Sequence, residues 1–295
     1  MALPRELRGT IREIEIHTRR IVDALMSGEY HSAFKGHGLE FAESRPYQPG
    51  DDIRAMDWNV TARAGKPFVK VFHEERELSL ILMVDLSGSQ RFGSGADFKS
   101  EIAARACALL AFSALRNNDK VGLLVFTDTV ELYVPPRKGR SHALRLIREI
   151  LYFQPRGRGT DLGGALEYLY RVTHKTSIVF LVSDFNAGGY ERQLRALSRR
   201  HDVIALRTRD PRETTLPDAG YIAVEDAETG ERIVVNTSSP ALRAEFERTV
   251  KAEDEMRARM FAAARVDEVV IDTSGSFAEP LVKFFRLRER RKRFG

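Results

Sequence analysis

From residue 78 onward, short apolar runs alternate with longer amphipathic segments, and this alternation is the feature that most constrains the fold. Strands are expected at about 78–85, 120–126, 130–134, 177–183, 202–207 and 268–272. Helices are expected at about 98–116, 141–152, 162–173, 190–200, 240–264 and 277–290. This order is typical of an α/β fold, in which a mostly parallel sheet carries helices on both faces.

Two segments depart from simple alternation. The turn at 127–129 is too short to hold a crossover helix, so the strand that follows it should be an antiparallel edge strand. The segment YIAVEDAETGERIVV contains two alternating runs around a turn, which predicts a β-hairpin at about 220–236, before the long helix. We therefore expect a domain at 78–295 with this hairpin as an insertion.

Residues 1–77 follow a different pattern and form a separate region. Apolar residues recur at helical spacing between residues 5 and 26, which predicts an amphipathic N-terminal helix. From residue 29 to 76, Gly, Pro, Asp and aromatic residues crowd together, which indicates short strands and fixed turns in an irregular β region.

The formal charge of +5 is unevenly distributed. The C-terminal segment LVKFFRLRERRKRFG holds seven basic residues and one Glu, so the rest of the chain is close to neutral. A basic tail of this kind can touch phosphate or anionic lipid, but it is also typical of a solvated helix end. The distribution argues against a nucleic-acid partner.

The sequence contains no run of about 18 to 20 apolar residues, the length that a transmembrane segment needs. The N-terminal residues lack the apolar core of a secretion signal, and the single Cys107 cannot form an internal disulfide. These observations predict a cytoplasmic protein without a transmembrane segment.

Acidic and hydroxyl side chains gather where the predicted strands end. Asp85, Ser87 and Ser89 follow the first strand of the series, Asp184 ends another, and Thr160 lies in the turn before a helix. Ligands of open α/β sheets bind outside the carboxyl ends of the strands, so these residues are expected on one surface. Their donors are all oxygen, which suits Mg²⁺, an ion that keeps waters and seldom has an all-protein cage.

The motif DLSGS, the turn GTDL and the strand end SDF together resemble the metal-ion-dependent adhesion site of von Willebrand factor type A domains. The resemblance implies that Asp85, Ser87 and Ser89 hold the ion directly or nearly so, and that Thr160 and Asp184 complete its shell directly or through water. It implies Mg²⁺, or Mn²⁺ in vitro, with a vacant position for an acidic side chain of a protein partner. Since only two carboxylates face the ion, it would remain electrophilic enough to take a third.

Other site classes fit the same loop less well. A haloacid dehalogenase phosphatase needs a second Asp where Ser87 stands, a serine hydrolase elbow reads G-x-S-x-G, and a P-loop ends in Lys-Ser or Lys-Thr. We therefore expect no catalytic residue and no enzyme activity. Two alternatives stay open: a metal-dependent phosphohydrolase, and a structural scaffold in which Ser87, Ser89 and Thr160 only cap helices and turns around an unfilled site.

The region before the sheet narrows the resemblance. Its run GHGLEFAESRPYQPGDDIRAMDWNVTARAGKPFVKVFHEERE resembles the hallmark of domain-of-unknown-function family fifty-eight, bacterial proteins with a von Willebrand type A fold. The resemblance extends over about residues 20–290. Members are commonly linked with MoxR-type AAA+ ATPases, which implies an accessory role in chaperone-like assembly or maturation. This chain departs from the pattern at Gln90, where a Met often follows the loop of residues 85–89, which we call the metal loop. It also lacks the transmembrane helices of many relatives.

Five residues of this region have two interpretations: Asp51, Asp52, Asp57, Trp58 and Arg63. Carboxylates, an aromatic ring and a guanidinium in close order can form an internal salt-bridge and stacking cluster that fixes the segment. They can instead form a surface on which a partner docks.

The sequence thus predicts a Mg²⁺-dependent protein-interaction module. The expected partner is a MoxR-type AAA+ ATPase or that ATPase's client, engaged through an acidic side chain at the ion.

Overall fold

The computed structural model describes residue 34 and residues 39–74, 78–95 and 97–294. The helix predicted at 5–26 lies outside these residues. Within them the chain forms two compact units, one at residues 34–78 and one from residue 79 onward. No helix in the described part of the chain is long and apolar enough to cross a bilayer.

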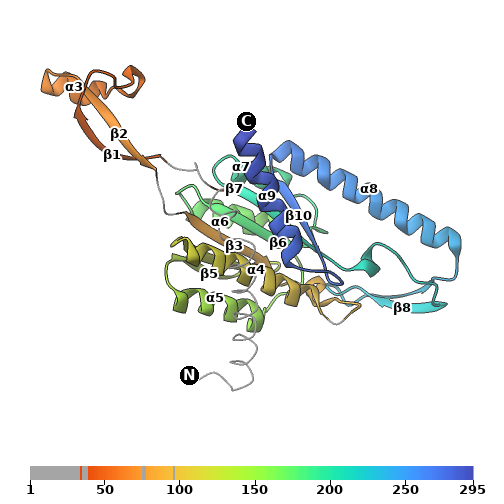
Figure 1. Ribbon diagram of the computed structural model, residues 1–295. Helices are drawn as coiled ribbons and strands as arrows, with labels where there is room; N and C mark the ends of the chain where they lie inside the picture. Colours follow the sequence, from red (N-terminus) through yellow and green to blue (C-terminus); the bar gives the residue numbers. More distant parts are fainter. Residues whose placement is uncertain (1–33, 35–38, 75–77, 96, 295) are drawn as a thin grey trace. The chain divides into compact units, whose positions relative to one another are not determined.

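The larger unit is built on a six-stranded sheet (Figure 1). Its strands lie in the order β10 (Asp267–Asp272), β7 (Asp202–Arg209), β6 (Ile178–Ser183), β3 (Ser79–Asp85), β4 (Lys120–Phe126) and β5 (Val130–Arg137). All neighbours run parallel except β5, which pairs antiparallel with β4 at the edge. This arrangement confirms the predicted α/β fold with one antiparallel edge strand. The central strands are almost continuously apolar because helices bury both faces.

Helices cover the two faces of this sheet. One face is covered by α4 (Lys99–Arg116), α5 (Arg140–Tyr152) and α9 (Ala278–Phe294). The other is covered by α6 (Leu162–Val172), α7 (Glu191–Ser198) and the C-terminal part of α8 (Pro240–Ala264). Each strand therefore contributes alternate side chains to two separate apolar layers.

The connections reverse direction around β3. From β3 the chain continues to β4 and β5 on one side, and it then crosses to β6, β7 and β10 on the other side. The connection that leaves β3 therefore runs toward one edge of the sheet, and the connection that leaves β6 runs toward the other. The position between these two strand ends is a topological switch point, where open α/β sheets bind their ligands. Asp85 and Asp184 leave the sheet at this point.

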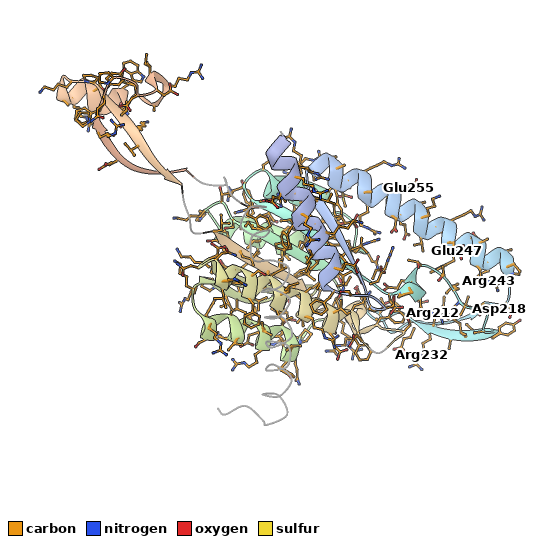
Figure 2. The ribbon with its side chains drawn as sticks, viewed as in Figure 1. Arg212, Asp218, Arg232, Arg243, Glu247 and Glu255 are labelled. Atoms are coloured by element: carbon orange, nitrogen blue, oxygen red, sulfur yellow. The ribbon has the colours of Figure 1, made fainter. Side chains whose placement is uncertain are left out.

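A two-stranded antiparallel hairpin of β8 (Tyr221–Glu225) and β9 (Arg232–Asn236) precedes α8. Figure 1 shows α8 running from the hairpin back toward the sheet. Charged side chains such as Glu247 and Glu255 line this helix in Figure 2, and its buried side chains lie only in its last third. The hairpin and the first part of α8 are therefore largely in contact with solvent.

The smaller unit is an antiparallel ribbon of β1 (Leu39–Pro46) and β2 (Phe68–Glu74). The segment between these strands contains the 3₁₀ helix η1 (Ile53–Ala55) and the α-helix α3 (Trp58–Ala64). The sequence pattern predicted only strands and turns here. A short helix forms because the carboxylate of the residue before it caps its first N–H groups and a left-handed glycine ends it.

Candidate metal centre

Asp85 fixes the loop that follows β3. Its side chain is buried; Oδ1 accepts a hydrogen bond from the backbone N–H of Ser87 at 2.9 Å, and Oδ2 accepts one from the Ser183 hydroxyl at 2.6 Å. Ser183 is the last residue of β6, the strand beside β3. These two bonds hold the Asp85 carboxylate in one orientation at the switch point.

Ser87 and Ser89 bring two hydroxyl groups to the same loop. The 3₁₀ helix η2 (Gly88–Arg91) begins directly after Ser87, and this tight turn places the two Oγ atoms 3.1 Å apart. Two oxygens bound to adjacent octahedral positions of Mg²⁺, each at roughly 2.1 Å from the ion, are about 3 Å apart. The spacing of the pair therefore fits neighbouring ligands of this ion.

Asp184 supplies the second carboxylate and is buried at the end of β6. Burial, together with the negative charge of Asp184, raises the pKa of Asp85 to about 6. The next residue, Phe185, has a φ of 60°, a left-handed conformation that is strained for a bulky side chain. Its ring packs edge-on against Phe261, with centroids 5.2 Å apart. Two buried carboxylates and a strained residue beside them are features of a functional site.

The structure adds Lys99, which sequence reasoning missed. This first residue of α4 is completely buried, and its Nζ lies 2.8 Å from Asp184 Oδ2 and 2.5 Å from Glu213 Oε1. Glu213 ends the 3₁₀ helix η3 (Pro211–Glu213). Burial opposes the charge on Lys99, but the two carboxylates outweigh it and raise its pKa. The ammonium therefore compensates one of the two carboxylates of the site.

Thr160 lies in the loop before α6. The Gly88 N–H donates to the backbone oxygen of Arg158 at 2.8 Å, which holds this loop beside the metal loop. The Thr160 hydroxyl donates to Glu228 Oε1 at 2.7 Å, and Glu228 belongs to the turn between β8 and β9. Among the described residues, Thr160 is thus bonded to Glu228 rather than to the other four predicted ligands. Nothing in the sequence pattern pointed to Glu228.

The donors suit Mg²⁺ by their chemistry. They comprise two carboxylates and three hydroxyls, and the pair of buried acids leaves negative charge that one ammonium only partly offsets. In the described part of the chain, no three His, Cys, Asp or Glu side chains form a metal-binding group, so the hydroxyls are needed to hold an ion here.

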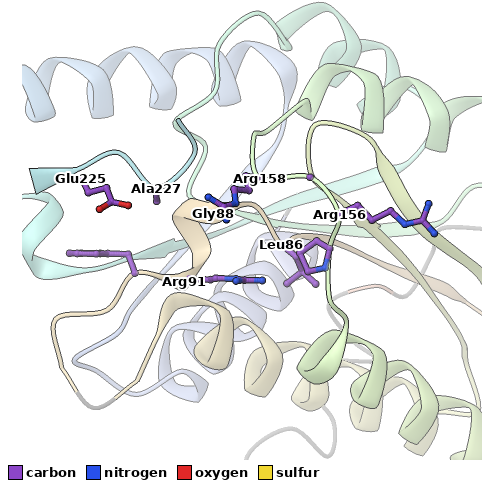
Figure 3. A pocket seen from close by; sticks show the side chains of 10 residues that line it. Leu86, Gly88, Arg91, Arg156, Arg158, Glu225 and Ala227 are labelled. Atoms are coloured by element: carbon purple, nitrogen blue, oxygen red, sulfur yellow. The ribbon is translucent and has the colours of Figure 1, made fainter. Parts of the chain in front are cut away.

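An open cavity of about 520 Å³ adjoins this loop. Leu86 and Gly88 form part of its wall, and the hairpin contributes Glu225 and Ala227 (Figure 3). The cavity thus lies between the metal loop and the hairpin.

Three arginines line the same cavity: Arg91, Arg156 and Arg158. All three side chains are exposed, and within the described residues none forms an ion pair. Figure 3 shows Arg91 and Arg158 close to Gly88, with Arg156 farther along the wall. The cavity is therefore a positively charged recess that adjoins the loop after β3, although none of the five predicted ligands lines it.

Gln90, directly after the loop of residues 85–89, is buried. Its Oε1 accepts a hydrogen bond from the Thr208 hydroxyl at 3.0 Å. Because Thr208 belongs to β7, this bond ties the metal loop to a strand on the far side of β6.

The three acids predicted in the smaller unit, Asp51, Asp52 and Asp57, bond mainly to residues close to them in the chain. Asp51 pairs with Arg45 through two hydrogen bonds of 2.7 and 2.8 Å, and Asp52 caps η1. Asp57 caps α3 and accepts a hydrogen bond from the Ser44 hydroxyl at 2.7 Å. Through these contacts the three acids hold the turn and the two short helices of the segment.

Trp58 and Arg63 do not join those acids. Trp58 is 67% exposed and Arg63 is also exposed. The Asp57 oxygens accept hydrogen bonds from the Ser44 hydroxyl and from N–H groups of α3. A docking role for these two exposed side chains stays a proposal.

Comparison with known proteins gives one family and several distant structures. The family described as "Protein of unknown function DUF58" matches residues 43–256. The uncharacterized protein Mb1516 of Mycobacterium bovis is 34% identical over 290 residues, which cover 97% of this chain and 90% of that protein. The conserved hypothetical protein BatB from Bacteroides thetaiotaomicron is 18% identical, with a TM-score of 0.47, covering 72% of this chain and 99% of that one. The SpRpn10 VWA domain is 12% identical, with a TM-score of 0.41, covering 70% and 94%.

Proposed function

This chain belongs to the DUF58 family, and we propose that it is a Mg²⁺-dependent protein-interaction module. The observation that carries the proposal is the meeting of Asp85 and Asp184 at the switch point, beside the paired hydroxyls of Ser87 and Ser89. Open α/β sheets bind ligands at this position, and oxygen donors of these kinds suit Mg²⁺.

Each predicted ligand has a role in this proposal. Asp85, Ser87 and Ser89 would hold the ion, with Asp184 and Thr160 completing the shell directly or through water. When bound, Mg²⁺ supplies a positive centre that accepts a carboxylate from outside the chain. Lys99 helps, because its ammonium offsets the charge of Asp184 and leaves the ion short of negative charge.

The partner in this proposal is an acidic protein segment. One carboxylate would reach the ion, and further acidic groups would pair with the arginines of the adjacent cavity, which form no ion pair within the described residues. Family resemblance suggests a MoxR-type AAA+ ATPase or its client as the source of that segment, in chaperone-like assembly or maturation. The proposed location is the cytoplasm, where an ATP-driven partner has its nucleotide.

A binding measurement with purified proteins tests this function. The MoxR-type ATPase from the same organism would be immobilised, and this protein would be added in Mg²⁺ and again after chelation. We expect binding in Mg²⁺, its loss on chelation, and no binding by Asp85→Ala. Binding that is unaffected by both chelation and Asp85→Ala would refute the metal-dependent interaction.

One observation favours a second candidate, a scaffold whose site never fills. The Lys99 ammonium already lies against Asp184, so part of the negative charge is compensated without a metal ion. A protein of this kind would show no Mg²⁺ binding heat and no rise in melting temperature with Mg²⁺.

A further inference from the structure

The β8–β9 hairpin places a carboxylate against the candidate metal site. Glu228 Oε1 lies 2.7 Å from the Thr160 hydroxyl, although the two residues are 68 positions apart in the chain. The preceding residue, Ala227, approaches the metal loop so closely that a Cβ at Gly88 would lie 2.2 Å from its backbone oxygen. Glycine at position 88 therefore permits the hairpin to reach this loop.

The turn that carries Glu228 is held by its own hydrogen bonds. The Asp226 carboxylate accepts from the backbone N–H of Glu228 at 2.9 Å and from that of Thr229 at 2.8 Å. Gly230, with a φ of 77°, donates to the Asp226 backbone oxygen at 2.8 Å. Such local bonds fix a turn before it meets anything else, so Glu228 is presented in a set position.

The strands of the hairpin are weakly anchored by comparison. Tyr221, Ile233 and Val234 are 76%, 55% and 71% exposed, so they bury little apolar area against the rest of the unit. A two-stranded hairpin without further packing is only marginally stable. The contacts at its tip can therefore be exchanged for others at a small cost in free energy.

The spacing at Thr160 also matches a metal shell. Neighbouring ligands on octahedral Mg²⁺ are about 3 Å apart, and the Thr160–Glu228 oxygen separation is close to this value. A carboxylate is a stronger ligand for this ion than a hydroxyl. Glu228 therefore offers the same chemistry that an acidic partner would bring.

We propose that Glu228 is an additional ligand of this metal site, supplied by the chain itself, which an acidic partner must displace to reach the ion. This inference rests on the proposed function. The hairpin closes the site while no partner is present. Displacement selects partners that make further contacts, such as those with the arginine-lined cavity, because a lone carboxylate only replaces one ligand with its equivalent.

The test uses the full-length protein with Mn²⁺ alone, in the wild type, Glu228→Gln and Glu231→Gln. Glu231 is exposed in the same turn, and its carboxylate makes no hydrogen bond with a described residue, so it is a matched control. Electron paramagnetic resonance gives the affinity, and water-proton relaxation gives the number of waters on the bound ion. We expect Glu228→Gln to bind Mn²⁺ about tenfold more weakly and to carry about one more water than the wild type, with Glu231→Gln unchanged.

A second arm tests displacement with a short synthetic peptide rich in Asp and Glu. In the presence of Mn²⁺, the peptide should bind Glu228→Gln more tightly than the wild type, because no internal carboxylate competes with it. Circular dichroism and melting without metal verify that each variant is folded.

The outcomes separate this inference from the proposed function. If the wild type binds no Mn²⁺ or Mg²⁺, the proposed function fails and the inference fails with it. If the wild type binds Mn²⁺ but Glu228→Gln has the same affinity or the same water count, only the role of Glu228 is overturned. Equal peptide affinity in the two proteins overturns displacement.

Discussion

The Lys99 ammonium lies 2.8 Å from Asp184 Oδ2, and this buried pair joins the start of α4 to the end of β6. The helix and the strand are 85 positions apart at these residues, so the bond is a tertiary tie across the candidate metal centre. It determines both how stable the centre is and how much charge an incoming ion would meet.

Replacing Lys99 by Met will leave Asp184 buried without its counter-charge. We expect the free energy of unfolding to fall by about 3–5 kcal/mol, the usual cost of removing one member of a buried ion pair. Urea denaturation followed by circular dichroism measures this change. Glu213→Gln is the control, and its effect should be smaller because the Glu213 side chain is 28% exposed. A loss of less than about 1 kcal/mol in Lys99→Met would show that Asp184 does not depend on Lys99.

Mg²⁺ should partly repair the Lys99→Met variant. A divalent ion beside Asp184 replaces the missing positive charge, so the rise in melting temperature on adding Mg²⁺ should be larger in the variant than in the wild type. Differential scanning calorimetry at several Mg²⁺ concentrations measures the two shifts. A smaller shift in the variant would mean that Lys99 is needed for the ion to bind.

The arginine cavity should affect partner binding and leave metal binding unchanged. Replacing Arg158 by Gln removes an exposed charge that forms no ion pair within the described residues, so stability and Mg²⁺ affinity should not change. Affinity for the acidic partner should fall about tenfold, and added salt should reduce the difference. Arg192→Gln, an exposed change on α7, is the control. Partner affinity equal to that of the wild type would exclude the cavity from the interface.

Acid should destabilise the protein through His201. This side chain is 3% exposed and its Nδ1 accepts the Ser177 N–H at 3.3 Å; burial, and then the charge of Arg200, lower its pKa to about 4. The unfolded chain takes up the proton near pH 6.5, and the folded protein takes it up only near pH 4. Stability is therefore unaffected by His201 above about pH 7 and falls as the pH drops from 6.5 to 4, by roughly 3 kcal/mol in all.

Urea unfolding at a series of pH values from 7 to 4.5 measures that slope. In His201→Gln the contribution of this residue to the slope should disappear, since glutamine does not titrate. Parallel stability curves for the wild type and the variant would show that another group is responsible.

Much of the fold could be predicted because its signals are local. The buried strands are apolar runs whose bounds are visible in the sequence, and the three-residue turn at 127–129 required the edge strand to reverse. Asp85 and Asp184 could be expected to converge because the carboxyl ends of parallel strands share one edge of the sheet. The helix α3 was missed because a seven-residue helix has too few turns to show periodicity, although Asp57 before it is a capping residue.

The missing parts of the site depend on contacts between distant segments. A Lys at the start of a helix is normally solvated, and the burial of Lys99 arises only when α4 packs beside the ends of β6 and η3. An acid in a hairpin turn is also normally solvated, so Glu228 gave no signal. Its approach to Thr160 depends on how the hairpin folds back, and sequence spacing does not determine this direction.

Calorimetric titration of the metal-free protein with Mg²⁺ decides whether the chain holds an ion at Asp85, with Asp85→Asn beside the wild type and Asp218→Asn as an exposed control. Asp85 is the buried carboxylate on which the candidate centre depends, so we expect binding of Mg²⁺ at a single site by the wild type and the control, and none by Asp85→Asn. The melting temperature should rise with Mg²⁺ in the same two proteins. No binding heat and no melting shift in the wild type, or the same binding in Asp85→Asn, would show that Asp85 holds no Mg²⁺ ion.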